Sequence, residues 1–106
     1  MFIINLNYKV SLDLVDKYLD KHVAYLNEQY ANGKFHISGR KIPKVGGVII
    51  SNIADKTELL EIIEKDPFKI YDVAAYEIIE FKLSKVSHEF KFLTEEVLDK
   101  TVKEEK

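Results

Sequence analysis

The chain has 106 residues, of which 46% are apolar and 32% charged, a composition typical of one globular domain and unlike that of a disordered protein. It contains no cysteine, which excludes a disulfide scaffold, a cysteine nucleophile and cysteine-based zinc sites. The apolar runs are far shorter than the roughly 20 residues of a membrane span, and the N-terminus lacks the basic stretch of a signal peptide. We therefore expect a soluble cytoplasmic protein with no membrane contact.

The net charge of −2 argues against nucleic-acid binding, which usually requires a basic domain or stripe. The charges are unevenly distributed, however. Residues 29–54 contain no acidic side chain, and their basic residues are Lys34, Arg40, Lys41 and Lys44. This stretch indicates either a site for a small organic anion or a hairpin that its lysines keep soluble.

Residues 2–9 alternate apolar and polar side chains, which predicts a strand with one apolar face. Ser11 can cap the helix that follows. Apolar residues recur every three or four positions along this helix, which spans about 20 residues; its stripe consists of Leu12, Val15, Leu19, Val23, Leu26 and Tyr30. Gly33 follows its end and suits the left-handed conformation that often closes a helix.

The next predicted elements are a strand over residues 35–42, a turn over residues 43–47 and a strand over residues 48–53. Asp55 and Glu58 form a capping-box pattern at the start of a second helix, and Pro67 ends that helix near Asp66. Residues 73–83 form a fourth strand. The order β-α-β-β-α-β predicts an α+β, ferredoxin-like fold, with a four-stranded antiparallel sheet and two helices on one face.

The pattern is weaker after residue 83. Phe90 and Phe92 alternate with charged residues and indicate a short fifth strand. Thr94 can cap a final helix, whose apolar stripe consists of Val97, Leu98 and Val102. We therefore divide the chain into a ferredoxin-like domain, residues 1–83, and a C-terminal strand and helix extension, residues 84–106.

Two of the predicted strands are apolar on both faces, although the helices cover only one. The third strand has Val48 and Ile50 on one side and Ile49 and Ile53 on the other, and the fourth strand has a similar pattern. A second apolar face needs a cover. We expect this cover to be the sheet of a second copy related by a two-fold axis, and the C-terminal segment is the alternative.

His22 and Asp66 are the candidate catalytic residues. His22 lies within the apolar stripe, so its imidazole should face the sheet or the edge of a pocket; a core histidine with satisfied hydrogen bonds would fit the same pattern. Asp66 lies at the expected C-terminal end of the second helix, where the helix dipole disfavours a carboxylate unless a partner compensates it. An ordinary turn aspartate before proline is the alternative. Spacing does not determine whether the two side chains meet.

Two pairs of small residues, Ser38–Gly39 and Gly46–Gly47, flank the predicted turn. Glycine allows a backbone to approach a ligand closely, although turn geometry alone also accounts for these residues. The dinucleotide-binding, phosphate-loop and GxSxG patterns are all absent. The chain has three histidines without the spacing of a metal site, so we expect no metal and no cofactor.

Several segments that are unspecific alone form a specific combination: Met1–Ile4, Lys21–Leu26 with His22, Gly33–Phe35, Ser38–Gly39, Pro43, Gly46–Ile50, Asp66–Phe68 and Tyr76–Phe81. Through them the chain resembles the YciI-like, or YCII-related, family of small ferredoxin-like proteins in the dimeric α/β barrel superfamily. The resemblance covers residues 1–83 and leaves the C-terminal extension outside it.

The resemblance implies a homodimer that packs sheet to sheet, with a pocket beside each sheet in which His22 and Asp66 form a dyad. In this dyad Asp66 accepts a hydrogen bond from one imidazole nitrogen, and the other nitrogen is free for proton transfer. A basic side chain, Arg40 or a nearby lysine, would hold an anionic substrate. The implied substrate-binding residues are Ser38, Gly39, Arg40, Gly46 and Gly47. Relatives in the superfamily isomerise muconolactones, eliminate chloride from chlorinated rings or act as cofactor-free monooxygenases.

Two hypotheses follow from the sequence. In the first, the protein is a metal-free acid–base enzyme of isomerase or lyase type that acts on a small, anionic organic molecule through His22 and Asp66. In the second, it is a non-catalytic homodimer that binds a small ligand or serves as a scaffold, and the dyad only satisfies a buried polar pair.

Overall fold

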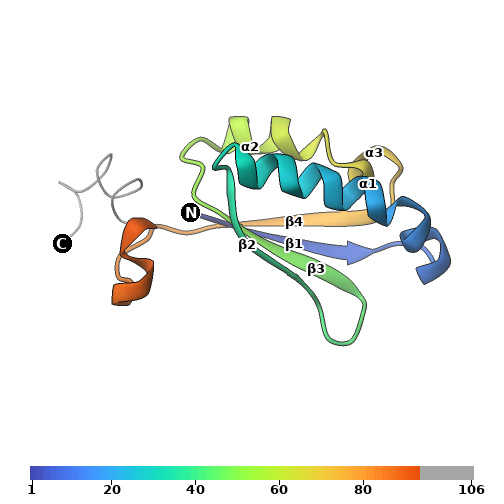
Figure 1. The fold of residues 1–106 in the computed structure, drawn as a ribbon, viewed down its shortest axis with the longest axis horizontal. Helices are drawn as coiled ribbons and strands as arrows, with labels where there is room; N and C mark the ends of the chain where they lie inside the picture. The colour runs from blue at the N-terminus through green and yellow to red at the C-terminus, as the bar shows by residue number, and fades with distance from the viewer. Residues whose placement is uncertain (94–106) are drawn as a thin grey trace.

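The computed structural model describes residues 1–93, which form one four-stranded sheet with its helices on one face (Figure 1). The strand order is β2-β3-β1-β4, and all neighbouring strands are antiparallel. This arrangement confirms the predicted α+β, ferredoxin-like fold. Its elements are β1 (Phe2–Tyr8), α1 (Leu12–Ala31), β2 (Phe35–Arg40), β3 (Gly46–Ser51), α2 (Lys56–Ile63), α3 (Pro67–Ile70) and β4 (Ala74–Glu80).

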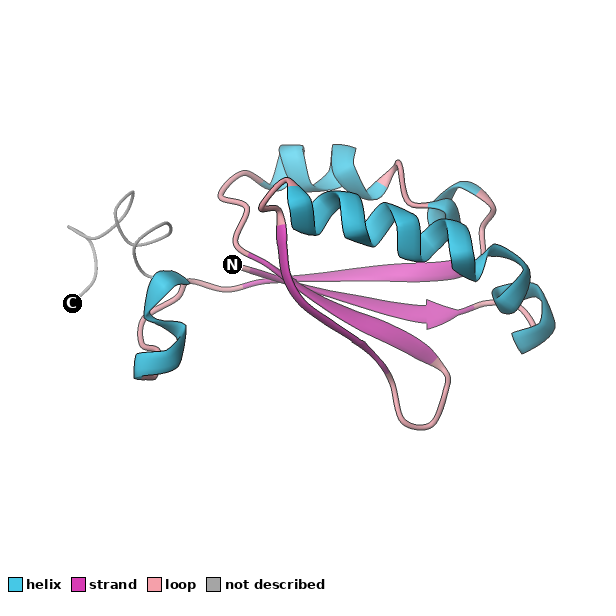
Figure 2. Ribbon diagram, viewed as in Figure 1, coloured by secondary structure: helices cyan, strands magenta, loops and turns pink. Residues whose placement is uncertain are grey.

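The central strand, β1, contributes much of the core. Its alternate residues Phe2, Ile4 and Leu6 are at most 2% exposed and point to the helix-covered face. Removing side chains of this size from water stabilises a fold by roughly 1.5–3 kcal/mol each. Tyr8 follows in the same alternation, so it too points toward the helix-covered face. Figure 2 shows how the helices α1–α3 lie over that one face of the sheet.

α1 turns a different face to the sheet from the one that its apolar stripe predicts. Its buried residues are Val15, His22, Tyr25 and Gln29. Three residues of the predicted stripe are each more than one third exposed: Leu12, Val23 and Tyr30. The helix is rotated because His22 and Tyr25 both find hydrogen-bond partners beneath it, on segments that follow β3 in the chain.

The predicted helix caps are only partly observed in the structure. Gly33 has the predicted left-handed conformation, with φ of +74°, whereas the side chain of Ser11 makes no capping hydrogen bond. Asp55 caps α2 by accepting a backbone N–H of the first turn. The predicted capping box is incomplete, because the Glu58 carboxylate lies 2.6 Å from the Lys34 ammonium group and forms an ion pair with it.

A short helix that the sequence analysis missed, α3, lies between α2 and β4. α2 ends at Ile63, three residues before the predicted end, and the chain turns before α3 begins at Pro67. Proline is well suited to the first position of a helix because its missing N–H has no partner to lose there. Asp66 therefore lies at an N-terminus, as the cap of α3, and not at the unfavourable C-terminal end of α2.

The predicted fifth strand is wrong. β4 ends at Glu80, and His88–Phe90 form a 3-10 helix. The described part of the segment after β4 packs beside Ile50 on the sheet face opposite the helices, in a small cluster of three buried side chains: Met1, Leu83 and Leu93. The final helix that we expect from Thr94 onward lies outside the described residues.

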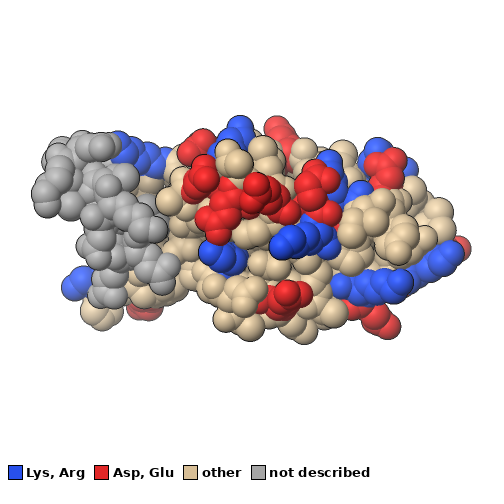
Figure 3. Space-filling view, turned by 90° about the horizontal axis from the view of Figure 1, so that it is seen from above, with Lys and Arg blue, Asp and Glu red and all other residues tan. Residues whose placement is uncertain are grey.

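The surface carries both signs of charge. Seen from the helix side, acidic and basic side chains lie next to one another without forming a single-sign field (Figure 3). Within residues 1–93 no helix has both the length and the apolar character that crossing a bilayer requires.

Candidate active site

Asp66 is the buried centre of the site, with only 1% of the residue exposed. One carboxylate oxygen, Oδ1, accepts the backbone N–H of Phe68 at 3.0 Å and so caps α3. The same oxygen lies 2.7 Å from Nδ1 of His22, which α1 places above it. The two residues therefore meet, which the sequence left open.

The hydrogen bond to Asp66 determines which imidazole nitrogen is available. An ionised carboxylate only accepts hydrogen bonds, so Nδ1 of His22 carries the hydrogen and donates it to Asp66 Oδ1. In the neutral imidazole the lone pair is then on Nε2, on the other side of the ring. This is the nitrogen that can take a proton from a ligand.

Tyr76 of β4 is a functional residue that the sequence analysis did not select. Its hydroxyl donates a hydrogen bond to the second oxygen of Asp66, Oδ2, at 2.5 Å. Burial raises the pKa of Tyr76 far above its usual value, and the charge of Asp66 and the hydrogen bond to it add to this effect. Tyr76 is therefore a permanent donor that holds the carboxylate in place.

Aromatic packing fixes the plane of the His22 ring. It stacks on the ring of Phe68 with a centroid distance of 4.0 Å and an interplanar angle of 2°. Tyr25 lies on the same side of α1, and its hydroxyl donates to the carbonyl oxygen of Ile62 at 2.9 Å, which ties α1 to α2. His22 is consequently held by a hydrogen bond at one nitrogen and by a stacked ring on one face.

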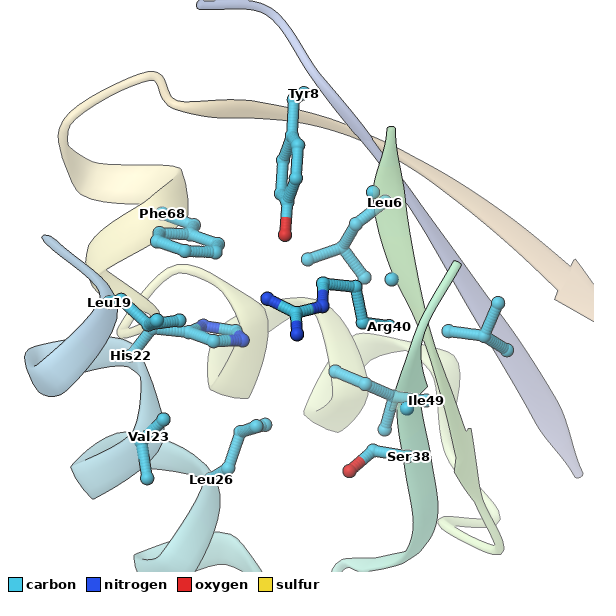
Figure 4. Close-up of a pocket in the computed structure, with 14 residues that line it drawn as sticks. Leu6, Tyr8, Leu19, His22, Val23, Leu26, Ser38, Arg40, Ile49 and Phe68 are labelled. Carbon is cyan, nitrogen blue, oxygen red and sulfur yellow. The ribbon is translucent and has the colours of Figure 1, made fainter. Parts of the chain in front are cut away.

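A cavity of about 190 Å³ lies between α1 and the β2–β3 side of the sheet. The rings of His22 and Tyr8 and the guanidinium of Arg40 border its interior (Figure 4). The side chains that form its apolar walls are Leu6, Leu19, Val23, Leu26, Ile49 and Phe68. The sequence-predicted residues that line it are His22, Ser38, Gly39, Arg40, Gly46 and Gly47, while Asp66 lies behind His22.

The structure requires glycine at position 46 but not at position 39. A Cβ at Gly46 would lie 1.8 Å from the carbonyl oxygen of Leu6, so glycine is required there by the close approach of β1. At Gly39 a Cβ would meet nothing within 4 Å. The sequence analysis expected a close approach between the backbone and a ligand at the glycine pairs. At Gly46 the close approach is to the backbone of the neighbouring strand β1.

Arg40 is the basic residue of the 29–54 stretch that lines the cavity. Lys34 is paired with Glu58, and the Lys41 ammonium group donates to the side-chain oxygen of Asn7 at 2.7 Å. A cationic contact with a ligand in this cavity therefore falls to Arg40. Within residues 1–93 no group of three or more potential metal ligands comes together.

Ser38 is tied to α1 at the edge of the cavity. Its hydroxyl and that of Tyr30 are 2.5 Å apart, and either can be the donor. This contact connects β2 to the last turn of α1. The Ser38 hydroxyl therefore has a hydrogen-bond partner within the protein.

The chain is similar to a known domain family and to solved structures. The YCII-related domain matches residues 1–82 of the chain, and no curated protein matches it. Among solved structures, a 5-chloro-2-hydroxyhydroquinone dehydrochlorinase from Burkholderia phenoliruptrix AC1100, in complex with 2,5-dihydroxybenzoquinone, is similar with a TM-score of 0.64. The two chains are 20% identical, and the match covers 77% of this chain and 94% of the other. At this identity the likeness concerns the fold.

Proposed function

This chain belongs to the YCII-related family, and on that premise we propose that it is an acid–base enzyme of isomerase or lyase type. In this proposal His22 moves a proton on a small organic molecule that binds in the cavity. The observation that carries the proposal is the buried Asp66–His22 hydrogen bond, because it leaves Nε2 of an oriented imidazole facing an open cavity.

The surroundings of Asp66 support its role as the orienting residue. When Nε2 takes a proton the imidazole becomes cationic, and the adjacent carboxylate stabilises that charge. The hydroxyl of Tyr76 and the backbone N–H of Phe68 each donate a hydrogen bond to the carboxylate and hold it in position. The proton is later returned from Nε2 to another atom of the ligand.

The size and walls of the cavity support a ligand of one ring. A dry cavity of roughly 150 Å³ can hold benzene, and this cavity is somewhat larger and mostly apolar. Arg40 adds a positive charge suited to an anionic group. The similar dehydrochlorinase is described with a single-ring quinone bound, which makes elimination from a substituted ring one of the reactions to test first.

The experiment compares wild-type protein with His22→Gln, which keeps a polar side chain but cannot accept a proton. Both are incubated with small ring carbonyl compounds, halogenated hydroquinones and other organic anions, and products are identified by mass spectrometry. We expect turnover in wild type and none in the variant, with the circular dichroism spectrum unchanged. If a ligand raises the melting temperature but always returns unaltered, the protein is the non-catalytic binding module of the second hypothesis.

We further propose that two copies pack through the sheet face opposite the helices. On that face Ile37 and Ile79 remain 41% and 45% exposed, although the segment after β4 packs beside Ile50. A polar pair on the same face, Asn5 and Glu77, is internally satisfied because Asn5 donates to Glu77 at 2.9 Å. Covering such a face requires an apolar partner, and a second copy offers the same surface.

Sedimentation of the full chain tests this dimer. Ile79→Asp places a charge in the proposed interface, so we expect the wild type to sediment as a dimer and the variant as a monomer. The matched control is Leu60→Asp, because Leu60 is 44% exposed but lies on α2, on the other side of the molecule. A monomeric wild type overturns the proposal.

A further inference from the structure

Tyr8 lines the cavity but takes no part in the hydrogen bond between His22 and Asp66. It is the last residue of β1, it lines the cavity and it is partly exposed. Its ring packs perpendicular to that of Phe68, with a centroid distance of 6.0 Å and an interplanar angle of 89°. Its hydroxyl points into the space that the His22 ring and the Arg40 guanidinium also border (Figure 4).

The hydroxyl of Tyr8 differs from those of the other tyrosines near the cavity. The hydroxyls of Tyr25, Tyr30 and Tyr76 each have a partner in the protein. Within the part of the chain that the structure describes, the Tyr8 hydroxyl has no hydrogen-bond partner. Because it lines the cavity and has no partner in this part of the protein, the phenol is available to a ligand.

Arg40 is the charged group that accompanies Tyr8. Across residues 1–93 no carboxylate forms an ion pair with Arg40, so its charge is available to the cavity. Burial raises the pKa of Tyr8, the charge of Arg40 opposes this rise, and Asp16 on α1 adds to it. The net shift is upward, so Tyr8 keeps its proton at neutral pH and acts as a hydrogen-bond donor beside a cation.

We propose that Tyr8 is a further catalytic residue and that, together with Arg40, it binds the carbonyl oxygen that becomes negatively charged when His22 takes a proton from the neighbouring carbon. This inference rests on the proposed function and names its substrate class, a small ring carbonyl compound with an acidic C–H next to the carbonyl. Donors placed where charge develops are typically a large part of the rate enhancement of an enzyme.

The electrons and protons of this step balance without a further reactant. The C–H bond breaks and its proton moves to Nε2 of His22. The electron pair of that bond forms a carbon–carbon double bond, and the carbonyl electrons move to the oxygen, which becomes an enolate held by Tyr8 and Arg40. When the carbonyl re-forms in an isomerisation, the proton returns from Nε2 to a different carbon. In an elimination a leaving group departs with its electron pair, and Nε2 then releases its proton to the solvent.

The test uses 4-nitrophenol, a flat ring whose ionised oxygen resembles such an enolate and whose absorption band reports its ionisation. Binding to the full chain is measured by absorbance titration for wild type, Tyr8→Phe, Arg40→Gln and His22→Gln. Tyr18→Phe is the matched control, because it removes the same atom from a tyrosine that stacks on Tyr71 and does not line the cavity.

We expect wild type to bind the ionised probe, and Tyr8→Phe and Arg40→Gln each to weaken binding about tenfold or more, as for the loss of a hydrogen bond to a charged group. Tyr18→Phe should bind as wild type does. No saturable binding by wild type, or equal affinity in Tyr8→Phe, overturns the inference. If Tyr8→Phe weakens binding but no ring carbonyl compound is turned over, the anion site stands and the proposed acid–base function fails.

Discussion

The imidazole of His22 and the phenyl ring of Phe68 lie flat against each other, with their centroids 4.0 Å apart. The two residues are also joined through one atom, because Asp66 Oδ1 accepts hydrogen bonds from His22 Nδ1 and from the backbone N–H of Phe68. The His22 ring cannot turn without losing both its stack and its hydrogen bond. Its Nε2 is therefore oriented before a ligand arrives, which lowers the cost of reaching a reactive geometry.

Replacing Asp66 with asparagine should separate the charge of the site from its shape. Asparagine also caps helices well, so we expect α3 to form in Asp66→Asn. Without the negative charge the imidazolium is less stable, and turnover should fall on the order of 10²-fold or more. Long-range ¹⁵N NMR checks the geometry independently: it should show His22 with its hydrogen on Nδ1 in wild type, and a hydrogen on Nε2 there would contradict the assigned dyad.

Removing the Tyr76 hydroxyl should destabilise the fold. In Tyr76→Phe the buried Oδ2 of Asp66 loses its donor, which typically costs about 1–3 kcal/mol. Urea unfolding measures this difference. Tyr30→Phe is the control, because its hydroxyl bonds Ser38 at an exposed position and surface changes of this kind usually stay within about 0.5 kcal/mol. Equal losses in the two variants would show that Asp66 does not depend on Tyr76.

Substitution by alanine should be costly at Gly46 and tolerated at Gly39. In Gly46→Ala the new Cβ would overlap the Leu6 carbonyl, so β1 and β3 must separate, and we expect a loss of about 1–3 kcal/mol or more. In Gly39→Ala the Cβ enters open space, so the free energy of unfolding should change by less than about 0.5 kcal/mol. Thermal unfolding of both variants tests the pair, and a tolerated Gly46→Ala would contradict the observed approach of the strands.

The stability of the protein should fall at alkaline pH. Burial, with the charge of Asp66 adding to it, raises the pKa of Tyr25 and of Tyr76 in the folded protein. In the unfolded chain these hydroxyls lose their protons from about pH 10. Above that pH the unfolded state binds fewer protons than the folded state, so the free energy of unfolding decreases as pH rises, and below it these two groups contribute no slope.

Urea unfolding between about pH 8 and pH 11 measures this slope, which should be shallower in Tyr76→Phe because one of the two groups is gone. The comparison with wild type cancels the contribution of other groups that titrate in the same range. An identical slope in both proteins would mean that Tyr76 ionises equally in the folded and unfolded states.

The layered fold could be predicted because its signals are local. Period-two alternation in residues 2–9 and the helical spacing from Leu12 onward depend on neighbours in the sequence. The rotation of α1 could not, because it depends on the bond between His22 and Asp66, 44 residues away. α3 has only four residues, too few for a periodic pattern, so Pro67 indicated the end of a helix and not the start of the next.

The site was predictable where residue types were unusual for their position. His22 was selected because a histidine is unusual within an apolar stripe. The β2–β3 turn was selected because two pairs of small residues flank it. Tyr76 gave no such signal, because a tyrosine between Ala74 and Ile78 in a strand has the pattern of an ordinary core residue. Its hydroxyl gains a role only where β4 passes Asp66, and that contact is tertiary.

The carboxylate of Asp66 has consequences for how this lineage can change. Because Asp66 caps α3, anchors Tyr76 and orients His22, a mutation at position 66 to a residue that cannot cap a helix damages the fold together with the site. A mutation at position 22 leaves the cap and the tyrosine contact of Asp66 intact. On the proposed function, descendants that abandon the activity are therefore expected to vary first at position 22 and to retain aspartate at position 66.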